Sequence, residues 1–523
     1  MISAISHVLR LGRAAFIVAR EGTFAIVDPE EPLPPPLKAL LRLARLIERR
    51  DQTAGPRLAR ALTRLGPTYV KLGQVLATRP DVVGVAMARD LEQLQDRLPA
   101  FSQAEAEATV AASLERPLAQ AFASFGPAVA AASIAQVHRA EVERDGVRRP
   151  VAVKVLRPNV AARFRRDLGS LMFAARTAEA WSSEARRLRS IEIVETLSRS
   201  VAMEMDLRLE AAALSEMAEN TRDDPDFAVP AVDWDRTSHH VLTLEWVEGI
   251  ALSDRAGLEA AGVDLPGLGR KVIQSFLRHA LRDGLFHADM HPGNLFVDPQ
   301  GRLVAVDFGI MGRLGMKERR FLAEILLGFI TRDYRRVAEV HFEAGYVPAH
   351  HSIENFAQAI RAIGEPIHNR RADEISMARL LTLLLEVTGL FDMRTRPELI
   401  LLQKTMVVVE GVARSFDPRL DIWKTADPVV RAWIERNLGP VGRVEGAVSG
   451  VGQLAKLLAT APAIAARASS LLEQLDAATR DGLVLAPETV AAIGRAEGHG
   501  NRWQTRALWV IALTFLGILW KLS

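Results

Sequence analysis

The sequence predicts an α+β protein built from more than one packed unit. Residues 37–115 place apolar side chains three and four positions apart, the spacing of helices that bury one face. Mixed strand and helix patterns follow to about residue 250, and helical patterns dominate from residue 265 onward. At 523 residues the chain exceeds the size of one hydrophobic core, which indicates two or three packed units.

Composition excludes several kinds of site and partner. The chain has no cysteine, so disulfides, thiolate metal sites and cysteine nucleophiles are all excluded, and a reducing cytoplasmic environment suits it. Lysine and arginine number 66 against 63 acidic residues, and no long basic run is interleaved with aromatic residues. We therefore expect no nucleic acid partner.

The most specific motif lies between residues 287 and 309. It reads His-Ala-Asp-Met-His-Pro-Gly-Asn-Leu-Phe-Val, then a short turn, then Leu-Val-Ala-Val-Asp-Phe-Gly. An acid with an amide five positions later, followed by an apolar strand ending in Asp-Phe-Gly, is typical of kinase-like enzymes. We interpret Asp289 as the catalytic base, with Asn294 and Asp307 as oxygen ligands of a Mg²⁺ ion that holds ATP. Each piece alone also fits a turn cap or a hairpin corner, but their order and spacing favour phosphate chemistry.

This hypothesis requires further residues upstream. Lys154 lies in the alternating strand Val-Ala-Val-Lys-Val and would contact phosphate, although a solubilising lysine at a strand edge is the alternative. Glu210, in a stretch of good helix formers, is the best candidate for its carboxylate partner. Residues 241–249 read as an apolar strand that leads into a glycine-marked connection, where backbone groups near Glu245 and Val247 would face adenine.

A glycine-rich phosphate loop is missing. Residues 128–138 all carry a Cβ atom, so positive φ angles and close backbone approach to phosphate are harder than with glycine. We assign Ala130, Ala131, Ala132 and Ser133 to the nucleotide site and expect them to hold phosphate differently. An ordinary turn of small residues between two strands is the alternative.

Together these motifs resemble the UbiB family of atypical kinase-like proteins, which is related to the mitochondrial ADCK/COQ-type proteins of ubiquinone synthesis. Two further signatures fit: Lys71-Leu72-Gly73-Gln74 matches the family's Lys-x-Gly-Gln motif, and Glu204-Met205-Asp206 matches its Glu-x-Asp motif. The resemblance extends from about residue 60 to about residue 345.

The resemblance implies a two-lobed protein-kinase-like fold with an N-terminal helical extension. It implies that the Lys-x-Gly-Gln helix lies across the site, so Lys71, Gln74, Glu204 and Asp206 join the catalytic residues. The expected activity is ATP hydrolysis or small-molecule phosphorylation in support of ubiquinone biosynthesis, with ATP and Mg²⁺ as cofactors. The expected partners are membrane lipid, a polyprenyl-phenol or quinone intermediate, and other ubiquinone-biosynthesis enzymes. The oligomeric state stays open, with a dimer as one option.

We expect five segments along the chain. They are a helical extension with the Lys-x-Gly-Gln motif (1–115), a kinase-like N-lobe (116–250), a helical C-lobe (251–440), a helical tail and linker (441–500) and a short hydrophobic membrane helix (503–522).

Both ends of the chain carry apolar stretches. Arg10 and Arg13 interrupt the apolar N-terminus, which argues against a cleaved signal peptide and favours an amphipathic helix lying on the protein's own core over one lying on lipid. The uncharged run 507–520 spans roughly 21 Å as a helix, short of the roughly 30 Å of bilayer hydrocarbon. We expect a C-terminal membrane-seeking helix, with docking onto the soluble body as the alternative. Arg502 and Arg506 predict an inner-membrane protein with its catalytic domain on the cytoplasmic side.

Two other classes of function fit the sequence less well. A 2-polyprenylphenol 6-hydroxylase would need flavin or iron, but no Gly-x-Gly-x-x-Gly follows a strand, and the one Glu-x-x-His (Glu365 to His368) is interrupted by proline. A pseudokinase acting as a lipid-binding scaffold is disfavoured because Lys154, Asp289, Asn294 and Asp307 are all present. His287 and His291 are four residues apart, but the proline and glycine that follow favour a bracing role over metal binding.

Overall fold

The protein is described here from a computed structural model. The described residues are 2–22, 57–77, 99–182, 185–186, 188–367 and 397–439, with single positions at 83, 87, 90, 91, 94, 387 and 389–393. The chain divides into two compact units, Met1–Ile434 and Glu435–Ser523, and the candidate site belongs to the first. The predicted tail 441–500 and the predicted membrane helix 503–522 lie outside the described residues. Within the described part, no helix is long and apolar enough to cross a membrane.

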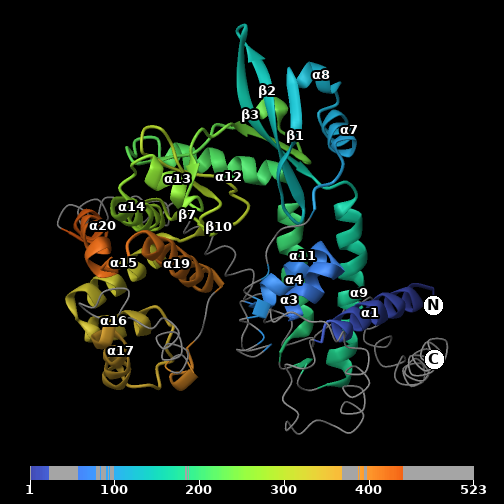
Figure 1. Cartoon of the computed structure of the whole chain (residues 1–523). Coiled ribbons are helices and arrows are strands. Elements are labelled where there is room, and N and C mark those ends of the chain that lie inside the picture. The colour runs from blue at the N-terminus through green and yellow to red at the C-terminus, as the bar shows by residue number, and fades with distance from the viewer. Residues whose placement is uncertain are drawn as a thin grey trace, which may run out of the picture. The chain divides into compact units, whose positions relative to one another are not determined.

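An antiparallel four-stranded sheet, in the order β1-β2-β3-β5, carries the predicted nucleotide-binding segments. Its strands are β1 (Ser124–Ala131), β2 (Ala135–Arg144), β3 (Val147–Leu156) and β5 (Val241–Glu245). The β2–β3 hairpin turns at Asp145 and Gly146, whose φ angles of 53° and 72° suit a tight two-residue turn. Helices α7 (Gln103–Ser113) and α8 (Leu118–Ala121) lie beside this sheet (Figure 1).

The alternation of side chains along β3 decides which of them face the site. Val151, Val153 and Val155 are buried and share a hydrophobic core with Val110 of α7. Successive side chains of a strand point to opposite faces, so Lys154 lies on the face away from that core. The sequence pattern Val-Ala-Val-Lys-Val therefore places one lysine on the open side of an otherwise apolar strand.

Three helices lie between β3 and β5 in the sequence and carry further motif residues. They are α9 (Val160–Trp181), α11 (Ser190–Glu204) and α12 (Leu207–Asn220). Asp206 caps the N-terminus of α12 by accepting a hydrogen bond from the backbone of Arg208. This cap sets the start of α12 and so places Glu210 in its first turn, with its side chain buried.

The N-terminal extension is helical, as expected, where the structure describes it. It contains α1 (Ile2–Arg20), α3 (Arg57–Leu65) and α4 (Pro67–Ala77), and α4 contacts both α9 and α11. Leu62, Tyr69, Val70, Leu91 and Leu94 form a shared hydrophobic core. That core holds α4, which carries the Lys-x-Gly-Gln motif.

A second group of short strands frames the acidic motifs. One sheet has the order β4-β9-β8-β6, with β4 (Phe227–Ala228), β9 (Leu303–Ala305), β8 (Leu295–Val297) and β6 (Ile250–Ala251). The other pairs β7 (Leu285–His287) with β10 (Met311–Arg313). The His-Ala-Asp segment therefore follows β7, and Asp-Phe-Gly follows β9, so both acids stand just after buried strands.

The remaining described elements are helices. They are α13 (Arg255–Ala260), α14 (Leu265–Arg278) with a π-helical turn at His279–Asp283, α15 (Met316–Thr331), α16 (Tyr334–Glu343), α17 (Ile353–Ile367), α19 (Pro397–Phe416) and α20 (Ile422–Leu438). Gly269 lets α14 approach α19 closely, since a Cβ there would lie 2.9 Å from the carbonyl oxygen of Ala413. This is the helical part that the sequence predicts from residue 265 onward.

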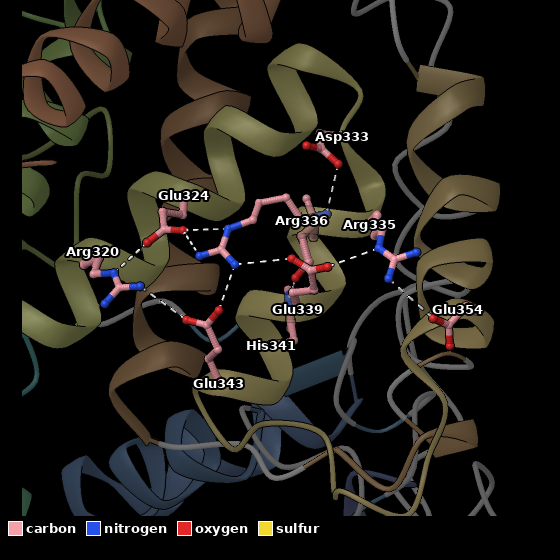
Figure 2. Close-up of polar contacts among 10 residues, drawn as sticks. Arg320, Glu324, Asp333, Arg335, Arg336, Glu339, His341, Glu343 and Glu354 are labelled. Atoms are coloured by element: carbon pink, nitrogen blue, oxygen red, sulfur yellow. Dashed lines mark hydrogen bonds and ion pairs between the residues drawn. The ribbon is translucent and has the colours of Figure 1, made fainter. Parts of the chain in front are cut away.

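An ion-pair network links α15 to α16 (Figure 2). Arg336 of α16 binds Glu324 of α15 with its Nε atom at 2.9 Å and Glu343 of α16 with its Nη1 atom at 2.7 Å. Arg320 also binds Glu324, at 2.6 Å. Burial alone would raise the pKa of Glu324, but these hydrogen bonds outweigh it and lower the pKa below its ordinary value. The network therefore holds the α15–α16 pair as one packed element.

Candidate functional site

Two predicted site residues bind the ammonium group of a third. The Nζ atom of Lys154 lies 2.9 Å from each carboxylate oxygen of Glu210 and 2.8 Å from Oδ1 of Asp307. These residues come from β3, from α12 and from the segment that follows β9. The structure thus brings together the lysine, its helical carboxylate partner and the acid of Asp-Phe-Gly, which are widely separated in sequence.

The charges in this cluster shift one another's pKa values. Burial alone would lower the pKa of Lys154, but the Asp307 and Glu210 carboxylates outweigh it and raise the pKa above its ordinary value. Lys154 likewise lowers the pKa of Asp307 to about 2, against the opposing effect of burial. Burial, with help from the Asp307 charge, raises the pKa of Glu210 to about 7 despite Lys154. Asp307 is therefore the anionic group best suited to bind a cation at neutral pH.

The backbone at Asp307 is unusual for a residue with a side chain. Its φ angle is 62°, in the left-handed region that favours glycine. Within Asp-Phe-Gly the positive φ angle is at Asp307 and not at Gly309. A Cβ atom on Gly309 would lie 3.5 Å from Oδ1 of Asp307 and 4.0 Å from Oε2 of Glu210, which are ordinary van der Waals distances. A left-handed backbone at a residue with a side chain, as at Asp307, is typical of functional sites, where surrounding contacts hold the strained conformation.

The segment after β7 is braced by His287. Its Nε2 atom donates to the carbonyl oxygen of Val306 at 3.0 Å, and its Nδ1 atom accepts from the backbone nitrogen of Asp289 at 3.0 Å. Burial lowers the pKa of His287, which keeps the ring neutral as these roles require. Because both ring nitrogens are engaged, His287 has the bracing role that the sequence favours and is a poor metal ligand.

Asn294 is placed directly against Asp289. Its amide nitrogen donates to the backbone oxygen of Asp289 at 3.1 Å and to the carboxylate at 3.3 Å. This orientation leaves the amide oxygen of Asn294 free of those contacts. The carbonyl of Asn294 accepts from the backbone of Val306, one residue before Asp307, at 2.9 Å. The three predicted acid and amide residues are therefore joined by short hydrogen-bonded links.

The same segment is also held from α19. The hydroxyl of Thr405, which is fully buried, shares its proton between the carbonyl oxygen of Ala288 at 3.1 Å and that of Leu401 in its own helix at 2.8 Å. The contact with Ala288 fixes the backbone next to Asp289 from a helix more than a hundred residues later in the sequence. No local motif at Thr405 signals this role.

The two family motifs of the helical extension meet each other. The Nζ atom of Lys71, in α4, lies 2.8 Å from Oε2 of Glu204 at the end of α11, and both side chains are about one-tenth exposed. Lys71 also contributes to lowering the pKa of Asp307, which places it within electrostatic reach of the Asp-Phe-Gly acid. Asp206 instead pairs with Arg208 at 2.7 Å. Gln74 is half-buried on α4, nearly one turn after Lys71.

The alanine-rich loop between β1 and β2 is held by a residue that the sequence motifs do not identify. Arg157 donates from Nη2 to the carbonyl oxygens of Ala132, at 2.9 Å, and Pro99, at 2.7 Å. Its backbone nitrogen also donates to the carbonyl oxygen of Ile134 at 2.8 Å. No residue from 128 to 138, all of which are described, has a positive φ angle.

The four loop residues assigned to the nucleotide site differ in exposure. Ala130 is exposed at the end of β1, whereas Ala131 and Ala132 are half-buried. Ser133 is fully buried, and its hydroxyl has no hydrogen-bond partner. An unpaired buried hydroxyl costs free energy and is an exception among buried polar groups.

The predicted adenine-facing connection is only partly open. Glu245 pairs with Val151 across the β3–β5 ladder, and its backbone nitrogen donates to the carbonyl oxygen of Ala231 at 2.8 Å. The backbone N–H of Glu245 therefore already has a hydrogen-bond acceptor within the protein. Val247 is half-buried in the connection that follows β5.

The hydroxylase alternative raises the question of which metal-ligating side chains lie together. Within them, one group of three metal-ligating side chains lies close together, formed by His350, His351 and Asp392. A carboxylate-bridged iron pair needs two matched sets with bridging carboxylates. The acid and amide oxygens at Asp307 and Asn294 suit a hard divalent cation such as Mg²⁺ instead.

Comparisons with known proteins agree with this geometry. The model of the ABC1 atypical kinase-like domain matches residues 93–341, and the model of the UbiB helical domain matches residues 360–421. The chain is 39% identical over 448 residues to a protein from Marinobacter nauticus named "Probable protein kinase UbiB", and the match covers 84% of this chain and 81% of that protein.

A solved structure has the same fold. The complex of Rv3197 with erythromycin from Mycobacterium tuberculosis matches 75% of this chain and 97% of its own, with a TM-score of 0.50 and 24% identity. At this identity the likeness concerns the fold alone. It agrees with a kinase-like arrangement of mixed helices and strands.

Proposed function

Because the chain belongs to the ABC1/UbiB family of atypical kinase-like proteins, we propose that it is an ATPase or small-molecule phosphotransferase that uses Mg-ATP. The observation that carries the proposal is the position of Lys154 between Glu210 and Asp307. A lysine paired with a helical glutamate beside an Asp-Phe-Gly acid is the arrangement that kinase-like enzymes use to hold ATP phosphates. In this proposal Lys154 contacts phosphate oxygens and Glu210 keeps its ammonium group in place.

The metal ion would be held by Asp307 and Asn294. One donor is an anionic carboxylate and the other a neutral amide oxygen, and both are hard ligands that Mg²⁺ prefers. The low pKa of Asp307 keeps it ionised at any physiological pH. When bound, the ion would neutralise negative charge on the phosphates of ATP.

Asp289 is the proposed catalytic base. Its backbone is held by His287 and its carboxylate by the Asn294 amide, so the side chain has a defined orientation while remaining exposed. An exposed, oriented carboxylate can accept the proton of an attacking water or hydroxyl group. The acceptor in this proposal is water or a small hydroxyl compound.

The Lys71–Glu204 pair supports a small acceptor over a protein. It brings the Lys-x-Gly-Gln helix within electrostatic reach of Asp307. A helix at that position would occupy the space that a protein substrate needs. We propose that Lys71 and Gln74 face the phosphate site. In this proposal Glu204, at the end of α11, and Asp206, at the start of α12, hold the ends of those helices near the site.

The cellular role proposed here is support of ubiquinone biosynthesis. It rests on the UbiB name of the Marinobacter nauticus relative and on the motif resemblance. The proposed partners are membrane lipid, a polyprenyl-phenol or quinone intermediate, and other enzymes of that synthesis. The proposed location is the cytoplasmic side of the inner membrane.

The test is ATP hydrolysis by the Asp307→Asn variant. We expect turnover to fall about 100-fold or more, because the amide loses the negative charge that binds Mg²⁺. Lys154→Met should weaken ATP binding by removing the phosphate contact. Asp223→Asn is the matched control, since Asp223 is exposed. Wild-type turnover in a folded Asp307→Asn variant would refute the assignment.

A further inference from the structure

Helix α1 is attached to the body of the protein along one face. His7 stacks on Phe173 of α9, with ring centroids 5.6 Å apart, and its Nδ1 atom lies 3.0 Å from the hydroxyl oxygen of Ser170. Arg10 donates from Nη1 to the carbonyl oxygen of Arg166 at 3.2 Å. Since rising numbers in α1 meet falling numbers in α9, the two helices run antiparallel.

The outward face of α1 carries an apolar ridge. Ile5 is 54% exposed, Leu9 is 54% exposed and Phe16 is 42% exposed, whereas Ala14 and Ala19 are buried. At 3.6 residues per turn the three exposed residues lie within about 40° of one another around the helix. A narrow stripe of large apolar side chains in water is costly unless something covers it.

Arginines flank this ridge on α1. Arg13 and Arg20 are exposed, and Cζ of Arg20 lies 6.0 Å from the ring centroid of Phe16. Ile2–Arg20 contains no aspartate or glutamate. A helix with apolar residues and arginines on its outward face, and no acids, complements a surface that is both apolar and anionic.

A basic hollow lies at the start of α9, near helix α1. Asn159, Ala162, Arg165 and Arg166 line an open hollow of about 610 Å³ at the start of α9. Both arginines are exposed, and the backbone of Arg166 is the group that Arg10 of α1 contacts. The hollow therefore adds positive charge and space for an anionic headgroup beside α1.

We propose that the outward face of α1 docks on the surface of an anionic lipid bilayer. Ile5, Leu9 and Phe16 would enter the boundary between headgroups and acyl chains, and the arginines of α1 and α9 would bind headgroup phosphates. The inference specifies the surface by which the lipid partner of the proposed function is bound. It does not depend on ATP chemistry, so the two proposals can fail separately.

The absence of cysteine from the chain allows a direct test. A full-length Leu9→Cys variant carries a single thiol, which is labelled with a fluorophore sensitive to polarity. We expect a blue shift with phosphatidylglycerol vesicles, quenching by spin-labelled lipid, and a much weaker response to phosphatidylcholine vesicles. Trp234→Cys is the matched control, because Trp234 is 53% exposed on a different element. Its label should not respond to either vesicle.

The charge requirement is tested in the labelled Leu9→Cys background. Arg13→Gln with Arg20→Gln should weaken binding to the anionic vesicles roughly 30-fold at low salt, because each arginine near such a surface contributes separately. The matched control is Arg148→Gln with Arg149→Gln, which removes two exposed arginines from β3. Its vesicle affinity should stay unchanged.

Three outcomes would overturn the proposal. One is a label at position 9 that does not respond to anionic vesicles. Another is an equal response to both kinds of vesicle. The third is a blue shift that grows with protein concentration in lipid-free buffer, which would assign the ridge to a second copy of the chain. ATP hydrolysis by the same variants is a separate readout, so loss of vesicle binding with normal turnover would leave the proposed enzyme function intact.

Discussion

At the scale of single residues, the site depends on the electrostatic interactions among three ionisable side chains. Lys154 serves two carboxylates, of which Glu210 is buried and Asp307 is half-exposed. The buried carboxylate has a raised pKa and the half-exposed one a lowered pKa. This difference suits Glu210 to a positioning role and Asp307 to cation binding.

Arg157 is a residue whose role comes from its contacts alone. It holds the carbonyl oxygens of Ala132 and Pro99, so we expect it to position the alanine-rich loop for nucleotide. Arg157→Lys removes one of the two forked contacts and should weaken ATP binding about 10-fold, consistent with the loss of one or two hydrogen bonds to a charged group. The measurement is a calorimetric titration with ATP.

A matched control for Arg157 is available on the same sheet. Arg139→Lys alters an exposed arginine of β2 that lies over the Trp246 ring, with its Cζ atom 5.0 Å from the ring centroid. It should leave ATP affinity unchanged. Equal affinities for wild type and Arg157→Lys would show that the loop does not need this contact.

At the scale of elements, the Lys-x-Gly-Gln helix is placed by close packing at its glycine. A Cβ atom on Gly73 would lie 2.3 Å from Cδ1 of Leu94, 2.6 Å from Cδ1 of Leu62 and 3.3 Å from Cδ2 of Leu91. Three leucines thus press on the backbone of α4 at this point. The glycine of the motif has a packing reason, while the lysine two residues earlier makes the buried ion pair with Glu204.

Replacing this glycine should disturb the placement of α4. Gly73→Ala forces the leucines apart, and we expect a destabilisation of about 1–3 kcal/mol from overpacking. The measurement is the midpoint of urea unfolding. The penalty of Gly73→Ala should be smaller in a Leu94→Ala background than in the wild type, because that background lacks the side chain that the new Cβ atom approaches most closely.

Gly12→Ala provides the opposite case. Gly12 lies inside α1, and a Cβ atom there would meet nothing within 4 Å. Alanine is the better helix former, so this change should stabilise the protein by up to about 1 kcal/mol. If Gly73→Ala stabilised the protein in the same way, the packing argument for α4 would be wrong.

At the scale of the whole molecule, the site joins segments from distant parts of the chain. Lys154 comes from the antiparallel sheet, Glu210 from α12, Asp307 from the strands that frame the acidic motifs, and Lys71 from the helical extension. A ligand that bridges such segments stabilises the folded state because the unfolded chain cannot bind it.

Mg-ATP should therefore raise the temperature of thermal unfolding. At a nucleotide concentration 100 times the dissociation constant, the expected stabilisation is about 2.7 kcal/mol. Chelating the metal with EDTA should remove most of this effect in the wild type. Asp307→Asn should show a small effect of ATP that EDTA does not change, and a full Mg²⁺-dependent shift in that variant would contradict the assigned ligand.

The sequence by itself determined the local elements and the chemical types of the site residues. The alternating pattern around Lys154 predicts β3, and the spacing of Asn294 and Asp307 follows from the short turn between strands β8 and β9. These features depend on residues close together in the chain, where periodicity and motif spacing carry the information.

Only the tertiary structure decided which distant residues support the site. The Lys71–Glu204 pair, the hold of Arg157 on Pro99 and the contact of Thr405 with Ala288 each join segments far apart in sequence. The left-handed backbone at Asp307, where glycine would be expected, likewise depends on surrounding contacts. The physical reason is that local patterns fix which face of an element is apolar, whereas the choice of partner across that face depends on how the elements pack.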